Sequence, residues 1–165
     1  MNPDMPCPPE PSSPFLRKLR FWTPPLLWMA VLFFLSTDHF SAQHTGSFLK
    51  NLIHHWIPGI PDPLANTLHG LLRKAAHFCV YAVLALLLVR AFRFGNAGPW
   101  RARWAVGAGI IVSLYALADE WHQAFTSARG ASIYDSLLDT AGGLFAIACL
   151  WIYRRSRFRT KDSAQ

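Results

Sequence analysis

Ionisable side chains gather near one shared end of three long apolar stretches in this 165-residue chain. A charge at membrane depth costs about 2.5–3.5 kcal/mol by insertion scales, so such residues are rare and usually line a protein interior or a water-filled cavity. Acids, bases and imidazoles at one depth therefore indicate either a structural brace or a working site. The residues concerned are Lys74, His77, Asp119, Glu120, His122, Asp135 and Asp139.

The spacing of these residues predicts shared helical faces, because residues three, four or seven positions apart lie on one side of an α-helix. On the helix that carries Asp119, residues Glu120 and Gln123 form a separate stripe, rotated by about 100° from the face of Asp119. We therefore expect three helices to direct polar faces at one space, within reach of Arg129 in a loop. The three groups are Lys74, His77 and Tyr81; Tyr115, Asp119 and His122; and Asp135, Asp139, Gly142 and Gly143.

These residue types suggest acid–base chemistry or ligand binding. Two carboxylates beside two imidazoles can supply an acid and a base, since imidazole titrates near neutrality. Lys74 and Arg129 could hold a phosphate or a carboxylate. The hypothetical catalytic residues are His77, Asp119, Glu120 and His122. The hypothetical ligand-binding residues are Lys74, Tyr81, Gln123, Arg129, Asp135 and Asp139.

Two other interpretations compete with a working site. Nearby basic residues nearly balance the four acids, so the set could be a paired network that only fixes helix register. Asp135 alone is explained by helix capping, because Ser132 to Asp135 reads Ser-x-x-Asp. A metal site is the weakest alternative because no established ligand spacing is present, and we predict neither a metal nor a cofactor. Its ligands would be Asp119, Glu120, His122 and Asp139.

The composition indicates a membrane protein. Hydrophobic residues make up 52% of the chain and charged residues only 15%, whereas soluble domains are about 25% charged. The net charge of +7 comes from basic residues that flank the apolar runs, a pattern typical of topology signals and lipid contacts rather than of nucleic-acid binding. The three cysteines suggest neither a disulfide nor a zinc site.

Four apolar runs predict an all-α fold, a four-helix transmembrane bundle. A short interfacial amphipathic helix is expected between helices one and two, because apolar residues recur there at helical spacing over 48–57. Pro24 and Pro25 would occupy the first turn of helix one, where proline is tolerated. The runs cover about 21–36, 75–92, 104–118 and 136–153. The expected parts are a disordered Pro-rich cytoplasmic tail (1–20), a transmembrane domain (21–155) and a basic cytoplasmic tail (156–165).

Loop charges predict that both termini are cytoplasmic. Basic residues are abundant before the first run, between the second and third, and after the fourth, but sparse in the other two connections. Cytoplasmic loops carry an excess of Lys and Arg. The polar cluster would then lie at the outer end of the helices of a multi-pass inner-membrane protein.

The polar motifs resemble the VanZ-like family over about residues 30–150. This resemblance implies a small bacterial membrane protein with several spanning helices, and the founding member of the family is associated with resistance to the glycopeptide teicoplanin. The motifs are Ser36; Lys74-x-x-His77-x-x-x-Tyr81; Asp119-Glu120-Trp121-His122-Gln123-x-Phe125; Arg129; and Asp135-x-x-x-Asp139 with Gly142-Gly143.

The combined expectation is a cell-envelope protein whose outer-leaflet site binds an anionic lipid-linked or cell-wall-related ligand. Glycopeptide susceptibility is the phenotype that the resemblance suggests testing. The alternative is a membrane-embedded enzyme that uses the His/Asp/Glu set on such a ligand, and a small transporter ranks lowest. The expected partners are membrane lipids and a lipid-linked cell-wall precursor, with no nucleic acid.

Overall fold

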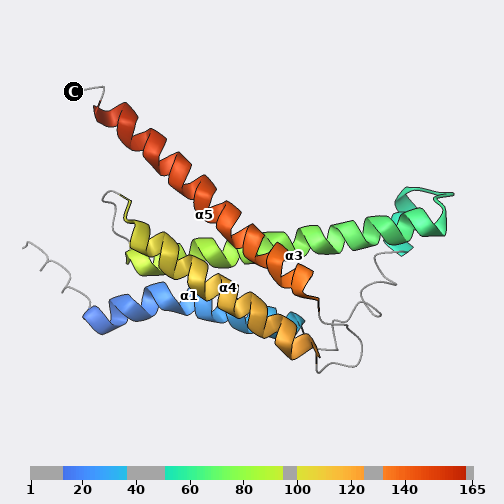
Figure 1. The fold of residues 1–165 in the computed structure, drawn as a ribbon, viewed down its shortest axis with the longest axis horizontal. Coiled ribbons are helices and arrows are strands. Elements are labelled where there is room, and N and C mark those ends of the chain that lie inside the picture. Colours follow the sequence, from blue (N-terminus) through green and yellow to red (C-terminus); the bar gives the residue numbers. More distant parts are fainter. Residues whose placement is uncertain (1–12, 37–50, 95–99, 125–131, 163–165) are drawn as a thin grey trace, which may run out of the picture.

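The computed structural model describes residues 13–36, 51–94, 100–124 and 132–162. Within these ranges the chain is all-helical and contains no strand. The four long helices are α1 (Pro14–Leu35), α3 (Asp62–Arg93), α4 (Ala102–Ala124) and α5 (Ile133–Asp162). They pack against one another, with α3 in contact with each of the other three and α5 crossing it (Figure 1).

Three of these helices are long and apolar enough to cross a membrane. The candidate spans are Asp62–Arg93, Ala102–Gln123 and Ile133–Arg157. Helix α1, which corresponds to the first of the four predicted spans, is not among them. Its apolar stretch is interrupted by Pro24 and Pro25, and its N-terminal half is basic. The structure therefore supports a multi-pass membrane protein with three candidate spans in its described part.

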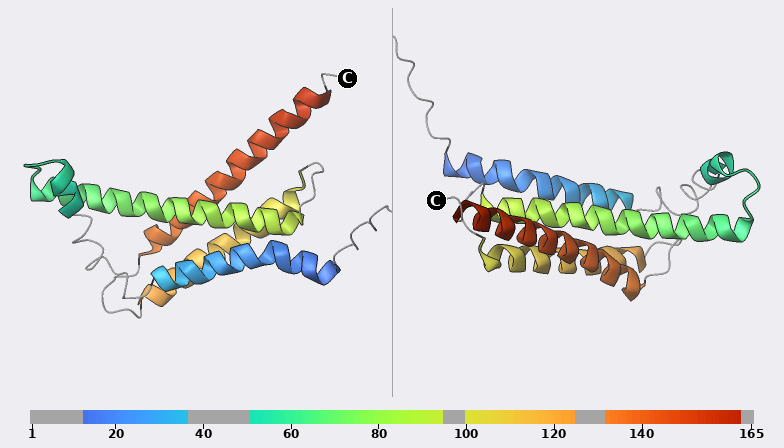
Figure 2. Two further views of the ribbon diagram at one scale, coloured as in Figure 1. Left: turned by 180° about the vertical axis from the view of Figure 1, so that it is seen from behind. Right: turned by 90° about the horizontal axis from the view of Figure 1, so that it is seen from above.

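Helix α1 begins earlier than the sequence predicted. Ser13 caps it by accepting a hydrogen bond from the Leu16 amide at 3.2 Å, and Pro14 takes the first turn, where a missing amide hydrogen costs nothing. Residues 14–20, predicted as tail, are therefore helical, while residues 1–12 lie outside the described part. Pro24 and Pro25 fall inside the helix, which bends along its length (Figure 2), as interior proline requires.

The C-terminal end of the chain also differs from the prediction, because α5 continues to Asp162. Most of the predicted basic tail, 156–165, is thus a helical extension of the last span. The predicted amphipathic helix is described only in its second half, where residues 51–56 are helical. Helix α3 begins at Asp62, well before the apolar run predicted over 75–92, and α4 ends at Ala124, beyond the run predicted over 104–118.

The core lies where α3, α4 and α5 meet in their apolar halves. Its buried residues are Tyr81, Leu84, Ala85, Leu88 and Val89 of α3, Ala108, Val112 and Ala116 of α4, and Ala146 and Ile147 of α5, together with Leu32 of α1. Two adjacent glycines of α5 allow the close approach. A Cβ on Gly142 would overlap the Phe78 backbone of α3, and one on Gly143 would lie 2.6 Å from Val112 Cγ1. Small residues at helix contacts serve this purpose in membranes.

Helix α3 extends well beyond its neighbours at its N-terminal end (Figure 1). Its 32 residues correspond to about 48 Å at 1.5 Å per residue, against a hydrocarbon thickness of about 30 Å. Residues 51–60 fold back onto this extension, where Ile53 and Ile60 pack against Ala65 and Leu68. This small cluster lies apart from the main core.

Candidate functional site

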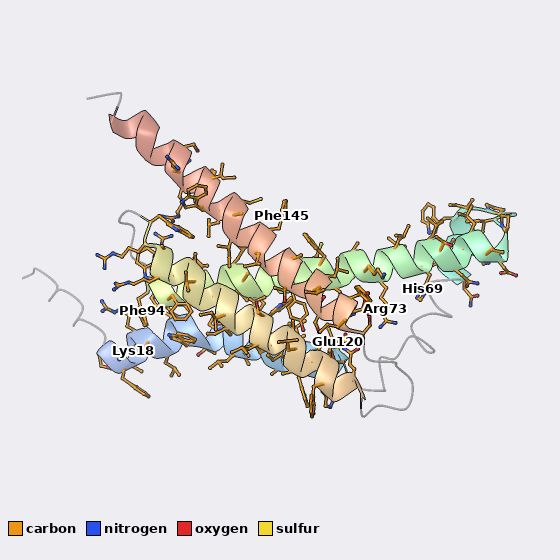
Figure 3. All side chains as sticks on the ribbon, in the orientation of Figure 1. Lys18, His69, Arg73, Phe94, Glu120 and Phe145 are labelled. Atoms are coloured by element: carbon orange, nitrogen blue, oxygen red, sulfur yellow. The ribbon has the colours of Figure 1, made fainter. Side chains whose placement is uncertain are left out.

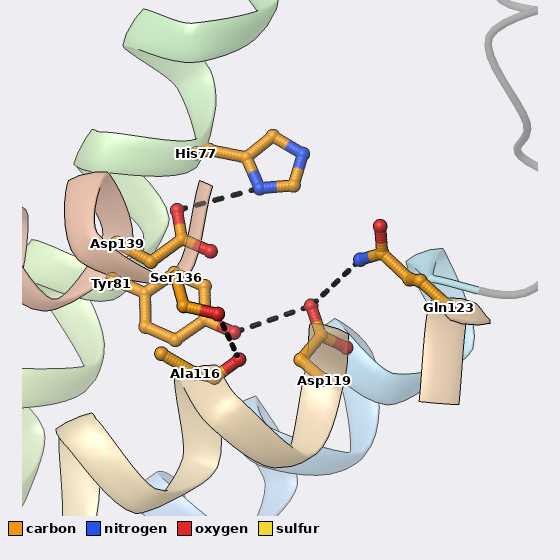
Figure 4. Close-up of polar contacts among 7 residues, drawn as sticks. All are labelled: His77, Tyr81, Ala116, Asp119, Gln123, Ser136 and Asp139. Carbon is orange, nitrogen blue, oxygen red and sulfur yellow. Dashed lines mark hydrogen bonds and ion pairs between the residues drawn. The ribbon is translucent and has the colours of Figure 1, made fainter. Parts of the chain in front are cut away.

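Asp119 of α4 is the central residue of the polar end. It is 5% exposed, and its Oδ2 atom accepts two hydrogen bonds from neutral donors. The Tyr81 hydroxyl of α3 donates at 3.3 Å, and the Gln123 side-chain amide, one turn further along α4, donates at 3.1 Å (Figure 4). A tyrosine and a glutamine thus fix the orientation of this carboxylate.

Asp139 of α5 forms the second contact across helices. It is 1% exposed, and its Oδ1 atom lies 3.5 Å from Nδ1 of the half-buried His77 on α3 (Figure 4). One turn earlier, the buried Ser136 hydroxyl donates to the Ala116 carbonyl of α4 at 3.3 Å. Helices α3, α4 and α5 therefore direct polar groups at one space, as their spacing predicted.

Several buried acceptors at this end have no hydrogen-bond partner among the described residues. The carboxylate oxygens are Asp119 Oδ1 and both of Asp139, and the imidazole atoms His77 Nδ1 and His122 Nδ1 are likewise buried without such a partner. Such atoms are rare in folded proteins and costly, about 1–3 kcal/mol for a neutral group and more for a charged one. The polar end therefore has acceptor capacity that the helices around it do not fill.

A cavity of about 140 Å³ adjoins this cluster. Asp119, His77 and Tyr81 form its polar side, together with Ser36 at the end of α1. Its apolar side consists of Leu32, Leu35, Ala76 and Val80. Leu35 and Ala76 are exposed, so the cavity reaches the surface between α1 and α3. It is smaller than the pockets of about 300–1,000 Å³ that enclose drug-sized ligands, so it suits one chemical group of a larger molecule.

The remaining predicted site residues lie around this cluster rather than in it. Glu120 is buried and accepts a hydrogen bond from the Ser132 amide at 2.8 Å, which ties the end of α4 to the start of α5. The His122 ring packs 4.6 Å from the ring of Phe33 on α1. Lys74 is exposed, one turn before His77. Asp135 is half-buried in the first turn of α5, where its amide donates to the Ser132 carbonyl.

Arg129, predicted to reach the site, lies outside the described residues. Within the described ranges no group of three His, Cys, Asp or Glu side chains is placed to hold a metal ion. The polar groups assembled here are carboxylates, an imidazole, a phenol and an amide. Such groups can bind hydrogen-bond donors, and a His–Asp contact can exchange a proton.

A family model described as VanZ/LLP1 matches residues 21–154. That range covers most of the chain and every residue of the cluster. The chain belongs to the VanZ-like family. No curated protein and no solved structure gives a significant match.

In this VanZ-like protein, sequence reasoning missed the contribution of α1. Ser36 was noted only as part of a motif, yet it lines the cavity with Leu32 and Leu35. Helix α1 is held in place by two long-range hydrogen bonds, from Trp28 Nε1 to the Val80 carbonyl at 2.9 Å and from the Tyr115 hydroxyl to the Met29 carbonyl at 2.5 Å. Bonds to backbone carbonyls of another helix leave no signal in residue spacing. Ser136 was also missed, although it lies three residues before Asp139 and so on the same face.

Proposed function

We propose that this VanZ-like membrane protein binds an anionic lipid-linked or cell-wall-related ligand of the cell envelope at its polar end. The observation that supports this most directly is the buried Asp119, which lines a cavity while its Oδ1 atom has no described partner. A brace would pair its charges with one another. Buried ionisable groups within spans are functional candidates in general.

The site is proposed to lie in the outer leaflet of the inner membrane, with α1 as a fourth span and both termini in the cytoplasm. Arg90 stacks over Phe21 and Arg93 over Trp104, so the basic ends of α1, α3 and α4 meet at one end of the molecule. Figure 3 shows Lys18 and Phe94 at that end, and Arg73 and Glu120 away from it. A reporter fused after Gly130 should then be periplasmic, and a cytoplasmic signal would reverse this orientation.

The anionic part of the ligand is assigned to basic residues at the rim. Lys74 is exposed one helical turn from His77, so its ammonium group can contact a phosphate while the rest of the ligand enters the cavity. Arg129 is proposed as a second anion contact, as its position in the sequence suggests.

Co-purification tests this function. The full chain, incubated with extracted cell lipids and examined by native mass spectrometry, should retain an envelope lipid. Asp119→Ala should lose it, whereas Asp62→Asn, a charge change at an exposed site far from the cavity, should retain it. Folded Asp119→Ala protein that keeps the same lipid would contradict the proposal. Cells that lack the protein should also show altered teicoplanin susceptibility, restored by the wild-type chain and not by Asp119→Ala.

One observation favours a second candidate function, a membrane enzyme. The 3.5 Å contact between His77 and Asp139 resembles the arrangement in which a carboxylate orients an imidazole base. In that case His77→Ala should still retain the lipid but should no longer alter it, and the altered species should be absent from the mass spectrum. If wild-type protein returns every added lipid unchanged, the enzymatic alternative fails and binding alone remains.

A further inference from the structure

We propose that the cavity receives the primary ammonium group of a zwitterionic lipid headgroup, with Asp119 as its acceptor. This inference rests on the proposed function and specifies the chemistry of the ligand. It differs from the expectation of a purely anionic ligand because the carboxylate in the cavity wall, Asp119, has a buried oxygen atom without a described partner.

The hydrogen bonds of Asp119 determine which kind of group can complete the site. Oδ2 is occupied by the Tyr81 hydroxyl and the Gln123 amide, both of which are neutral. Oδ1 is buried, without a described partner, on a side chain that lines the cavity. A buried carboxylate is stable only when it is paired and hydrogen-bonded. A cationic donor in the cavity supplies both requirements at once.

The other acidic side chains near Asp119 also favour a positively charged ligand group. Asp139 is buried with its Oδ1 atom 3.5 Å from His77 Nδ1, and Glu120 is buried and accepts a hydrogen bond from the Ser132 amide; neither lines the cavity, but both are acids close to it. A phosphate or carboxylate placed among these acids would be repelled. A primary ammonium group carries three N–H donors and no acceptor, so it can donate to Asp119 Oδ1 and carries the charge opposite to that of the carboxylate in the cavity wall.

The apolar side of the cavity indicates that the ammonium group belongs to a lipid and not to a free amine. Leu32, Leu35 and Val80 form this side, and the opening lies between α1 and α3 on a flank of the helices. A small, strongly hydrated amine gains nothing from such a wall, whereas an amphiphile buries apolar area against it. The volume of about 140 Å³ accommodates the end of a headgroup and excludes the acyl chains.

A zwitterionic headgroup also supplies an anionic group for the basic residue at the rim of the cavity. In a phosphoethanolamine headgroup the phosphate is separated from the ammonium group by two carbons. With the ammonium group at Asp119, the phosphate lies nearer the surface, on the side where Lys74 is exposed one turn from His77. The anionic contact of the proposed function and the cationic contact of the cavity then belong to one molecule.

The test compares lipids that share acyl chains. Purified full-length protein is offered equimolar phosphatidylethanolamine and phosphatidylglycerol in mixed micelles and examined by native mass spectrometry. Wild-type protein should retain the ethanolamine lipid about tenfold more, the size expected for one charge-assisted hydrogen bond. Asp119→Asn should reduce the ratio to near one, and Asp62→Asn should keep it. Equal retention by the wild type, or equal loss in both variants, would overturn the proposal.

A second measurement uses only wild-type protein and so does not depend on the folding of a variant. Stepwise N-methylation of the ethanolamine lipid removes N–H donors while keeping the charge. Retention should fall with each methyl group, and soluble ethanolamine should not compete. Retention that is independent of methylation overturns the ammonium assignment, and competition by free ethanolamine overturns its lipid origin. If phosphatidylglycerol is retained and then lost in Asp119→Ala, the inference fails while the proposed function stands.

Discussion

The two halves of the helices are built on opposite principles. In the apolar half, Leu84, Ala85 and Val112 are fully buried, and Gly143 lets α5 approach within contact of Val112. In the polar half, Asp119 and Asp139 are buried almost as completely, yet three of their four carboxylate oxygens have no hydrogen-bond partner in the described residues. In the apolar half, the side chains of the three helices fill the space between them. In the polar half, the hydrogen bonding of the buried carboxylates is incomplete, so we expect a ligand to bind there.

The largest effect should come from disturbing the apolar half. Gly142→Ala places a methyl group on the Phe78 backbone, which cannot rotate away, so α3 and α5 must separate. We expect a loss of about 3 kcal/mol in unfolding free energy, at the upper end for overpacking, measured by thermal unfolding in micelles. Gly70→Ala is the control, because a Cβ there meets no atom within 4 Å. Similar losses in both variants would show that contact at Gly142 is unimportant.

A substitution in the polar half should increase the free energy of unfolding rather than lower it. Asp139→Asn keeps the shape of the side chain and removes an incompletely bonded buried carboxylate. Stability should rise by about 1–3 kcal/mol, the usual cost of an unsatisfied buried group, while lipid retention falls. A destabilisation as large as that of Gly142→Ala would identify Asp139 as a structural brace and remove the contrast between the halves.

Trp28→Phe tests how firmly α1 is attached to the other helices. It deletes the part-buried hydrogen bond from the indole N–H to the Val80 carbonyl. We expect a loss of about 1 kcal/mol, with α1 becoming protease-sensitive before α3, α4 and α5. Simultaneous cleavage of all four helices would show that α1 belongs to the same cooperative unit.

The smallest effect is expected from Tyr81→Phe. The 3.3 Å hydrogen bond to Asp119 is long, and polar contacts between membrane helices average about 0.6 kcal/mol. The change in unfolding free energy should be near that value. The preference for the ethanolamine lipid should persist, because the Gln123 amide still orients the carboxylate. A large loss of stability would show that the Tyr81 hydroxyl stabilises the fold rather than serving the site.

Much of this contrast could be predicted from the sequence, because spacing along a helix determines which residues share a face. Lys74, His77 and Tyr81 illustrate both the success and its limit. His77 and Tyr81 reach Asp139 and Asp119 as expected, whereas Lys74 on the same face remains exposed. Spacing gives the direction of a side chain relative to its own helix but not the depth at which the neighbouring helix ends.

The start of α1 and its role could not be predicted in the same way. Prolines at 24 and 25 suggested a helix start, but Ser13 and Pro14 supply a better one, and the packing of Trp28 and Tyr115 stabilises the bent helix that follows. Tertiary contacts of this kind override a local preference. They also place Ser36 at the cavity, which no periodicity in the sequence indicates.

The contact at Gly142 has a consequence for how anything enters the molecule. Because the Gly142 backbone lies directly against the Phe78 backbone, α3 and α5 cannot slide or rotate past each other without breaking this close contact. The last turns of α1, with Leu32, Leu35 and Ser36, form another wall of the cavity, and α1 is tied to α3 by the hydrogen bond from Trp28 Nε1 to the Val80 carbonyl. Under the proposed function, entry of a headgroup is therefore expected to displace α1 while the contact between α3 and α5 is kept.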